Sequence, residues 1–158
     1  MREKNFTVIN SNDDSQVGLS CGYIVAECSR QFYNLKTKNI KNWITQDLDA
    51  SLNINLFNSI LNIKGKLAQE LESLQIMNLV SSLTGDKDLK WFYIMDLNLF
   101  KKMIFSNMKN IVETEGSGWG IFSVNDAILN DSERLHLTEK ENCTGHHWFT
   151  VAVEVNKL

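Results

Sequence analysis

The two ends of this chain carry short stretches of alternating apolar residues, which constrain its fold more than any other feature. In an extended strand, alternate side chains lie on the same face of a sheet. In residues 147–155, one such face consists of His147, Phe149, Val151, Val153 and Val155. In residues 6–10, one face consists of Phe6, Val8 and Asn10. We expect the two strands to pair antiparallel, so that the start of the last strand lies opposite the end of the first.

The sequence between these end strands is dominated by helical spacing. From Cys21 to about Tyr33, apolar residues recur at helical intervals. They predict one buried stripe, formed by Cys21, Val25, Cys28 and Phe32. Further helices are predicted over residues 43–52, 56–83 and 97–111.

The helix predicted over residues 56–83 is the longest, and Thr84-Gly85-Asp86 is expected to end it. Gly65 is its weak point, because glycine destabilises a helix interior. One face is expected to contain Leu56, Ile60, Ile63, Leu67, Leu71 and Leu74. Residues 121–124 predict a further strand. The resulting prediction is an α+β fold with a helical majority, in a single domain covering residues 1–158.

Composition narrows the class of protein. The 158 residues carry a net charge of -3 without a run of Lys or Arg, which argues against nucleic-acid or membrane-surface partners. No apolar stretch is long enough to span a bilayer, and residues 1–10 lack the apolar centre of a secretory signal. Cys21, Cys28 and Cys143 are irregularly spaced, which does not fit a disulfide framework and favours a reducing compartment. We expect a cytoplasmic monomer without a cofactor.

Cys21 is the candidate nucleophile. A Gly-containing loop meets a helical pattern at Cys21, so the sulfur is expected at a helix N-terminus, where the backbone dipole favours thiolate. A thiol near its reference pKa is only slightly ionised at neutral pH, so a base is also needed. His147, at the start of the last strand, is the expected base. His146 is the alternative, because adjacent strand residues point to opposite faces.

Antiparallel pairing of the end strands makes Asn10 a neighbour of His147, and Asn10 is therefore expected to orient the imidazole. Asp13 and Asp14 remain alternatives, because a carboxylate can also hold the imidazole and stabilise its cation. Gln16, five residues before Cys21, is expected to join the Cys21 N–H in stabilising an oxyanion. These residues predict a Cys-His-Asn thiol hydrolase.

The segment from Gln16 to Val25 resembles the nucleophile segment of ubiquitin-like-protein proteases of the SUMO-protease type. That segment reads Gln, a short spacer, Cys-Gly, an aromatic or aliphatic residue, then Val or Ala. His147-Trp148 is similar to the family's His-Trp strand. In the family His precedes Gln and Cys, whereas here it follows them. Joining the chain ends would restore the order, so the resemblance implies a circularly permuted papain-like core.

The chain also resembles a second family, the josephin deubiquitinases. They share the Gln five residues before the Cys and the His-Trp-Phe-Thr-Val strand seen at His147–Val151. They also keep the Cys-first order, although their Asn follows the His on the next strand. Both resemblances cover about 35 residues and imply cleavage after the C-terminal glycines of ubiquitin or a related protein.

A Gly-rich loop and a group of closely spaced Cys and His residues can each be interpreted in two ways. Gly118 and Trp119 lie in a Gly-rich loop that either passes an extended substrate tail or forms an ordinary turn. With Trp148, they are the predicted substrate-binding residues. Cys143, His146 and His147 lie within five residues but lack a fourth ligand and match no common zinc spacing, so no metal site is predicted.

The sequence therefore predicts a cysteine peptidase, either a deubiquitinase or a ubiquitin-like-protein protease. Its partner would be ubiquitin or a relative, and a secreted effector acting in a host cytosol is the alternative to a resident cytoplasmic protein. Two further hypotheses remain open. An effector-type acyltransferase would use the same triad, and a non-catalytic ubiquitin-binding module would merely retain the fold.

Overall fold

The computed structural model of the chain describes residues 4–9, 20–38, 53–103, 108–114, 118–126 and 147–155. Their strands form one mixed sheet in the order β1-β4-β3-β2. The strands are β1 (Lys4–Ile9), β2 (Phe92–Asp96), β3 (Trp119–Asn125) and β4 (Trp148–Val155). Strand β4 is antiparallel to both β1 and β3, whereas β2 is parallel to β3. The α+β class predicted from the sequence is confirmed.

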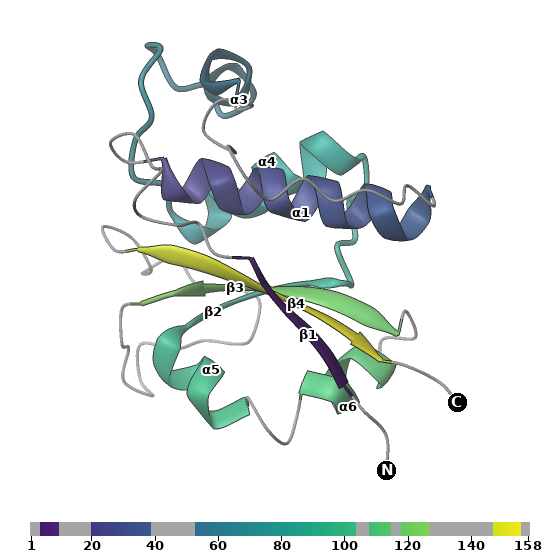
Figure 1. Cartoon of the computed structure of the whole chain (residues 1–158). Coiled ribbons are helices and arrows are strands. Elements are labelled where there is room, and N and C mark those ends of the chain that lie inside the picture. The colour runs from purple at the N-terminus through teal and green to yellow at the C-terminus, as the bar shows by residue number, and fades with distance from the viewer. Residues whose placement is uncertain are drawn as a thin grey trace.

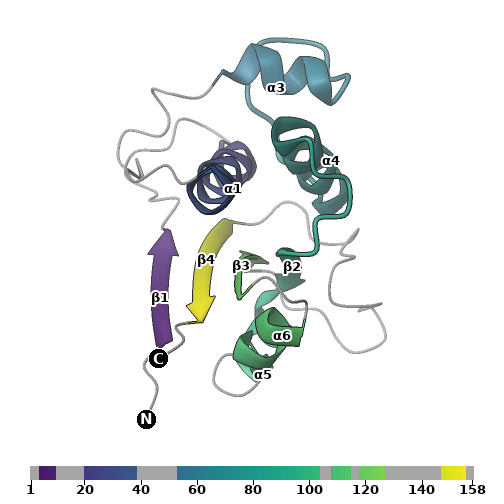
Figure 2. The same cartoon turned by 90° about the vertical axis from the view of Figure 1, so that its right-hand side faces the viewer.

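Helices cover both faces of this sheet (Figures 1 and 2). On one face lie α1 (Cys21–Thr37) and α4 (Ser73–Thr84), with α3 (Ile54–Ile60) farther out. On the other face lie α5 (Leu97–Met103) and α6 (Met108–Thr114). Each face has its own apolar core, and consecutive β4 residues alternate between them: Trp148 and Ala152 join the α1 side, Val151 and Val153 the α6 side.

The pairing of the two end strands agrees with the sequence prediction. Val8 pairs with Val151 and Ile9 with Thr150, so the end of β1 meets the start of β4. Because β4 also pairs with β3, it lies inside the sheet while β1 forms an edge. The alternation of apolar residues thus identifies both strands, and the expected antiparallel pairing is confirmed.

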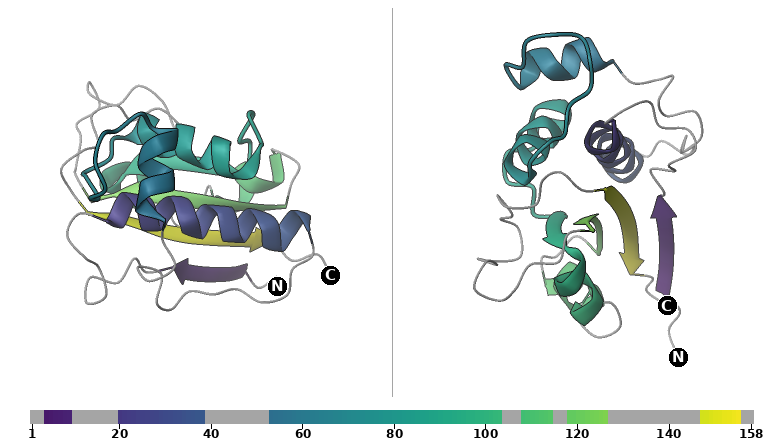
Figure 3. Two further views of the ribbon diagram at one scale, coloured as in Figure 1. Left: turned by 90° about the horizontal axis from the view of Figure 1, so that it is seen from above. Right: turned by 90° about the vertical axis from the view of Figure 1, so that its left-hand side faces the viewer.

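Helix α1 lies across the sheet beside α4 (Figure 3). The predicted stripe is buried, with Val25, Cys28 and Phe32 each at most 3% exposed, and Cys21 packs against the same core. Cys28 is therefore a core residue, as expected. At the far end of the helix, Lys36 forms an ion pair with Glu154 of β4. This ion pair joins the C-terminal end of α1 to β4.

The single long helix predicted over residues 56–83 is wrong. The chain instead forms α3 and α4 with a non-helical segment, residues 61–72, between them. Asn62 and Gly65 have φ angles of 59° and 109°, which no α-helix accommodates. Leu56 and Leu67 are 47% and 80% exposed, so the predicted apolar face does not form as one surface.

A buried amide explains why the chain turns at this point. Asn58 is 1% exposed, and its Nδ2 donates to the carbonyls of Gly65 and Leu67. Its Oδ1 accepts a 2.6 Å hydrogen bond from the hydroxyl of Tyr23 in α1. The side chain thus pairs with main-chain groups that a helix would have bonded internally. Gly85, with a φ angle of 76°, then ends α4 where the sequence predicted a stop.

The remaining helix predictions differ in outcome. The helix expected over residues 97–111 is divided between α5 and α6, and residues 104–107 lie outside the described residues. The helix predicted over 43–52 lies outside them entirely. Helices contain more of the described residues than strands do, which agrees with the expected helical majority.

Candidate functional site

Cys21 is the first residue of α1, as the helical spacing predicted. Ser20 precedes it as the N-cap residue, and the Ser20 carbonyl accepts the first helical hydrogen bond from Ile24. The thiol is partly buried, with the backbone amides of Trp148, Gly22 and Cys21 itself against it. The nucleophile candidate therefore lies where the N-terminus of α1 meets the start of β4.

The pKa of Cys21 differs from the sequence expectation. Burial raises the pKa of the thiol above 9.0, because a thiolate is poorly solvated in this environment. The three backbone amides lower the pKa, and the carboxylate of Asp126 raises it through its charge. Burial prevails over the helix N-terminus that was expected to favour thiolate. Cys21 is thus a neutral thiol that needs a base in order to react.

His147 stands immediately before β4 and is partly exposed. Its neighbour Trp148 provides the amide that contacts the Cys21 thiol, so the backbone of His147 lies at the same end of the sheet as Cys21. Asp126, the residue after β3, lies opposite His147. Its Oδ1 accepts a 3.0 Å hydrogen bond from the His147 N–H, and its own N–H donates to the His147 carbonyl at 2.9 Å.

Trp148, one of the predicted substrate-binding residues, is buried inside the protein next to this site. It is 1% exposed, so a bound substrate has no access to the indole. The indole N–H donates a 3.2 Å hydrogen bond to the carbonyl of Leu71, just before α4. Leu71 also packs on the start of α1, because a Cβ at Gly22 would lie 3.0 Å from the Leu71 Cβ. Leu71 thus joins the two elements that carry Cys21 and His147.

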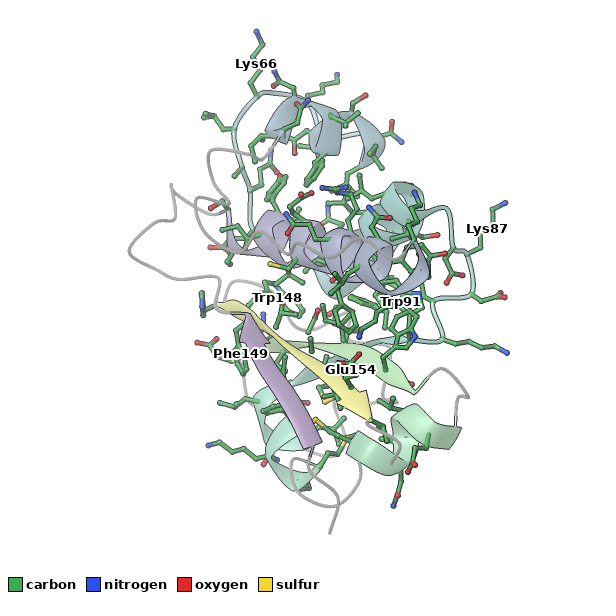
Figure 4. All side chains as sticks on the ribbon, turned by 45° about the vertical axis from the view of Figure 1, so that its right-hand side comes forward. Lys66, Lys87, Trp91, Trp148, Phe149 and Glu154 are labelled. Atoms are coloured by element: carbon green, nitrogen blue, oxygen red, sulfur yellow. The ribbon has the colours of Figure 1, made fainter. Side chains whose placement is uncertain are left out.

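Gly118 and Trp119 are not brought to Cys21. Trp119 begins β3, whereas the end of β3 at Asn125 pairs with Trp148 beside Cys21. The six intervening steps correspond to roughly 20 Å at about 3.3 Å per residue. Trp119 packs among Phe32, Tyr33 and Trp91 at the other end of α1. Figure 4 shows Trp148 and Glu154, the strand partner of Trp119, toward opposite ends of β4.

The other predicted site residues lie outside the described residues. These are Asn10, Gln16, the alternatives Asp13 and Asp14, and the competing base His146. Ile9, the residue before Asn10, pairs with Thr150, three positions after His147. The roles assigned to Asn10 and Gln16 therefore stay predictions.

Asp126 is the residue that the sequence analysis missed. Its position beside His147 could have been predicted, because consecutive strands usually lie next to each other. The predicted strand at residues 121–124 is followed along the chain by the predicted His147 strand. Antiparallel pairing of those two strands brings the residue after the first strand opposite the residue before the second. Asp126 and His147 occupy these positions.

Among the described residues, no group of three His, Cys, Asp or Glu side chains could hold a metal ion. Cys143 and His146, which with His147 form the closely spaced group of possible zinc ligands, lie outside the described residues. In the part of the chain that the structure describes, no helix is long and apolar enough to cross a membrane. No family model, curated protein or solved structure matches this chain.

Proposed function

We propose that this protein is a thiol hydrolase that cleaves a peptide or isopeptide bond through Cys21, with His147 as general base and acid. The observation that carries the proposal is the meeting of the α1 N-terminus with the start of β4. There the Cys21 thiol touches the amide of Trp148, the residue next to His147. A nucleophile, a titratable imidazole and backbone donors at one sheet end are the components of covalent acyl transfer.

The proposed chemistry follows from these groups. The imidazole of His147 takes the thiol proton, and the Cys21 sulfur attacks the substrate carbonyl carbon. Backbone N–H groups at the α1 N-terminus stabilise the oxyanion. The C–N bond then breaks, and the imidazolium gives its proton to the leaving amine. Water, deprotonated by His147, attacks the thioester, and the C–S bond breaks to return the thiol.

We further propose ubiquitin or a ubiquitin-like protein as the substrate class, on the basis of the two sequence resemblances. The pairing of β1 with β4 supports the permuted arrangement, because it places the N-terminal strand next to the His147 strand. In a papain-like core that neighbouring strand carries the orienting residue. Asn10 would then fill this role, and the core would be papain-like.

The raised pKa of Cys21 favours a second candidate, a non-catalytic module that binds the same partners. A buried, neutral thiol beside the Asp126 carboxylate is less reactive than a free thiol. Such a module would bind ubiquitin or a relative equally well with and without Cys21. The two candidates therefore differ in a measurable property.

The test is covalent labelling by ubiquitin and ubiquitin-like proteins that carry an electrophile at the C-terminus. We expect at least one probe to label the wild type at Cys21, and we expect Cys21→Ala to abolish labelling. Cys28→Ala is the matched control, because Cys28 is buried in the core and its loss should leave labelling intact. Unlabelled wild type across the panel, with equal binding by Cys21→Ala, would favour the non-catalytic module.

A further inference from the structure

The main chain of β4 directs its hydrogen-bonding groups to its two neighbouring strands in turn. At one end of the strand, the Asp126 N–H donates to the His147 carbonyl. At the other end, the Val155 N–H donates to the Gly118 carbonyl. In the antiparallel register of β3 and β4, the odd-numbered residues of β4 therefore form the hydrogen-bonded pairs with β3. The even-numbered residues direct their N–H and C=O groups the other way, toward β1.

Trp148 is the first even-numbered residue of β4, and its N–H contacts the thiol of Cys21. Two residues later, Thr150 pairs with Ile9 of β1, and its even number makes this a hydrogen-bonded pair. Trp148 comes one ladder step beyond that pair. The sulfur of Cys21 thus lies where the ladder of β4 would otherwise have a strand carbonyl as its acceptor.

Both donors of Trp148 are held inside the protein. The residue is 1% exposed, and a buried N–H needs an acceptor. The main-chain N–H meets the Cys21 sulfur, and the indole N–H donates to the Leu71 carbonyl at 3.2 Å. The ring itself packs in the core on the α1 side. The indole therefore anchors the residue whose amide meets the candidate nucleophile.

We propose that Trp148 is a positioning residue, whose buried indole anchors the start of β4 so that its main-chain N–H holds the Cys21 sulfur and stabilises the thiolate. This inference rests on the proposed role of Cys21 as the nucleophile. Hydrogen bonds to a charged acceptor are roughly twice as strong as neutral ones, so the N–H favours the thiolate over the thiol. Because Trp148 is buried, a substrate does not reach this N–H, and the effect belongs to the protein without substrate.

The N–H can be removed without changing any side chain. Cys143 permits native chemical ligation of a synthetic C-terminal peptide that begins at this residue. In the test protein, an ester replaces the peptide bond that precedes Trp148. In the matched control, an ester replaces the peptide bond that precedes Thr150, which removes an N–H directed to β1 from the same side of the same strand. Wild type assembled by the same ligation is the reference.

The measurement is the rate of Cys21 alkylation by iodoacetamide at pH 7, followed on the Cys21 peptide by mass spectrometry. Loss of the N–H should lower the thiolate fraction about tenfold. A thiolate of higher pKa is intrinsically more nucleophilic, so the alkylation rate should fall about threefold. The ester at Thr150 should keep the wild-type rate. The Asp126 carboxylate, which acts on the thiol, and the His147 imidazole are the same in each protein, so neither produces a difference.

A second pair of variants tests the indole anchor. Trp148→Phe keeps a buried ring but loses the hydrogen bond to the Leu71 carbonyl, so alkylation of Cys21 should slow by about twofold to threefold. Trp91→Phe is its control. Trp91 is 3% exposed, and its indole N–H donates to Asp86 at 2.8 Å, beside the other end of α1. This variant should keep the wild-type rate.

Three results would overturn the proposal. The first is an ester at Trp148 that leaves alkylation as fast as in the wild type or faster. The second is equal slowing by both esters, which would assign the effect to a weakened sheet. The third is wild-type alkylation in Trp148→Phe, because the indole would then anchor nothing. If the electrophilic ubiquitin probes stay unreacted while this alkylation pattern holds, the proposed function fails and the role of Trp148 stands. Circular dichroism identifies a variant that has not folded, and the ester pair then decides alone.

Discussion

At the scale of single residues, the close approach of Gly22 to Leu71 sets the position of Cys21. An added methyl group at residue 22 would lie 3.0 Å from the Leu71 Cβ and 3.2 Å from its Cγ and Cδ1. Leu71 is 1% exposed and its carbonyl accepts the Trp148 indole N–H, so it has little room to move. We predict that Gly22→Ala lowers the free energy of unfolding by about 1–3 kcal/mol, measured by urea denaturation.

Without the contact, the same substitution would be stabilising, because alanine favours a helix over glycine by about 1 kcal/mol. The sign of the change in the free energy of unfolding therefore shows whether the Gly22–Leu71 contact limits what residue 22 can be. A double-mutant cycle with Leu71→Ala is the control. Leu71→Ala removes the Cγ and Cδ1 atoms, at 3.2 Å, and keeps the Cβ, at 3.0 Å, so it relieves part of the clash. The combined loss should therefore be smaller than the sum of the two single losses. Strict additivity would contradict the packing explanation.

Some properties of the candidate site follow from the local sequence, and others depend on residues far away along the chain. The places of Cys21 at the start of a helix and of His147 at the start of a strand could be predicted from the sequence, because helical spacing and strand alternation each identify one end of an element. The burial of Trp148 could not, since its partner, the Leu71 carbonyl, is 77 positions away. The raised pKa of Cys21 was missed for a related reason. Desolvation depends on what packs over the thiol, and the helix position alone does not show that.

At the scale of elements, Gly65 distinguishes a broken helix from a continuous one. Its φ angle of 109° strains any other residue, and no atom lies within 4 Å of a Cβ added there. We predict that Gly65→Ala destabilises the protein by about 1–2 kcal/mol through backbone strain. In a continuous helix over residues 56–83 it would stabilise by about 0.5–1 kcal/mol. Urea denaturation gives the sign, and Leu67→Ala, at an 80% exposed position nearby, should change stability by less than about 0.5 kcal/mol.

The incorrect helix and the correct end strands differ in what determines them. Strands β1 and β4 follow from alternation, which depends on neighbouring residues alone, and their pairing follows from having apolar faces to bury. The break between α3 and α4 depends on Asn58, whose side chain bonds to Tyr23 in another helix. Because the apolar spacing continues past Asn58 and Gly65, the sequence pattern predicted a helix there. Tertiary hydrogen bonding overrode that pattern.

At the scale of the whole molecule, the core on the α1 side contains protonatable groups that are kept neutral. Burial raises the pKa of Cys28 and of Cys21 above 9.0, and that of Tyr23 above 10.0. In the unfolded chain these groups titrate near their ordinary values. As pH rises above about 9, the unfolded state therefore loses protons that the folded state retains. The free energy of unfolding must then fall with increasing pH.

We predict that stability is constant with respect to these groups below about pH 8 and declines from pH 8 to 10, measured by urea denaturation under reducing conditions. Cys28→Ala should flatten the decline, because one fully shifted group contributes a slope of up to about 1.4 kcal/mol per pH unit. The cavity that Cys28→Ala leaves lowers the free energy of unfolding equally at every pH, so it does not change the slope of that free energy against pH. Lys36, whose pKa burial lowers from 10.5, acts with the opposite sign, so the range stops at pH 10. Equal slopes for Cys28→Ala and wild type would show that the Cys28 thiol ionises as readily in the folded protein as in the unfolded chain.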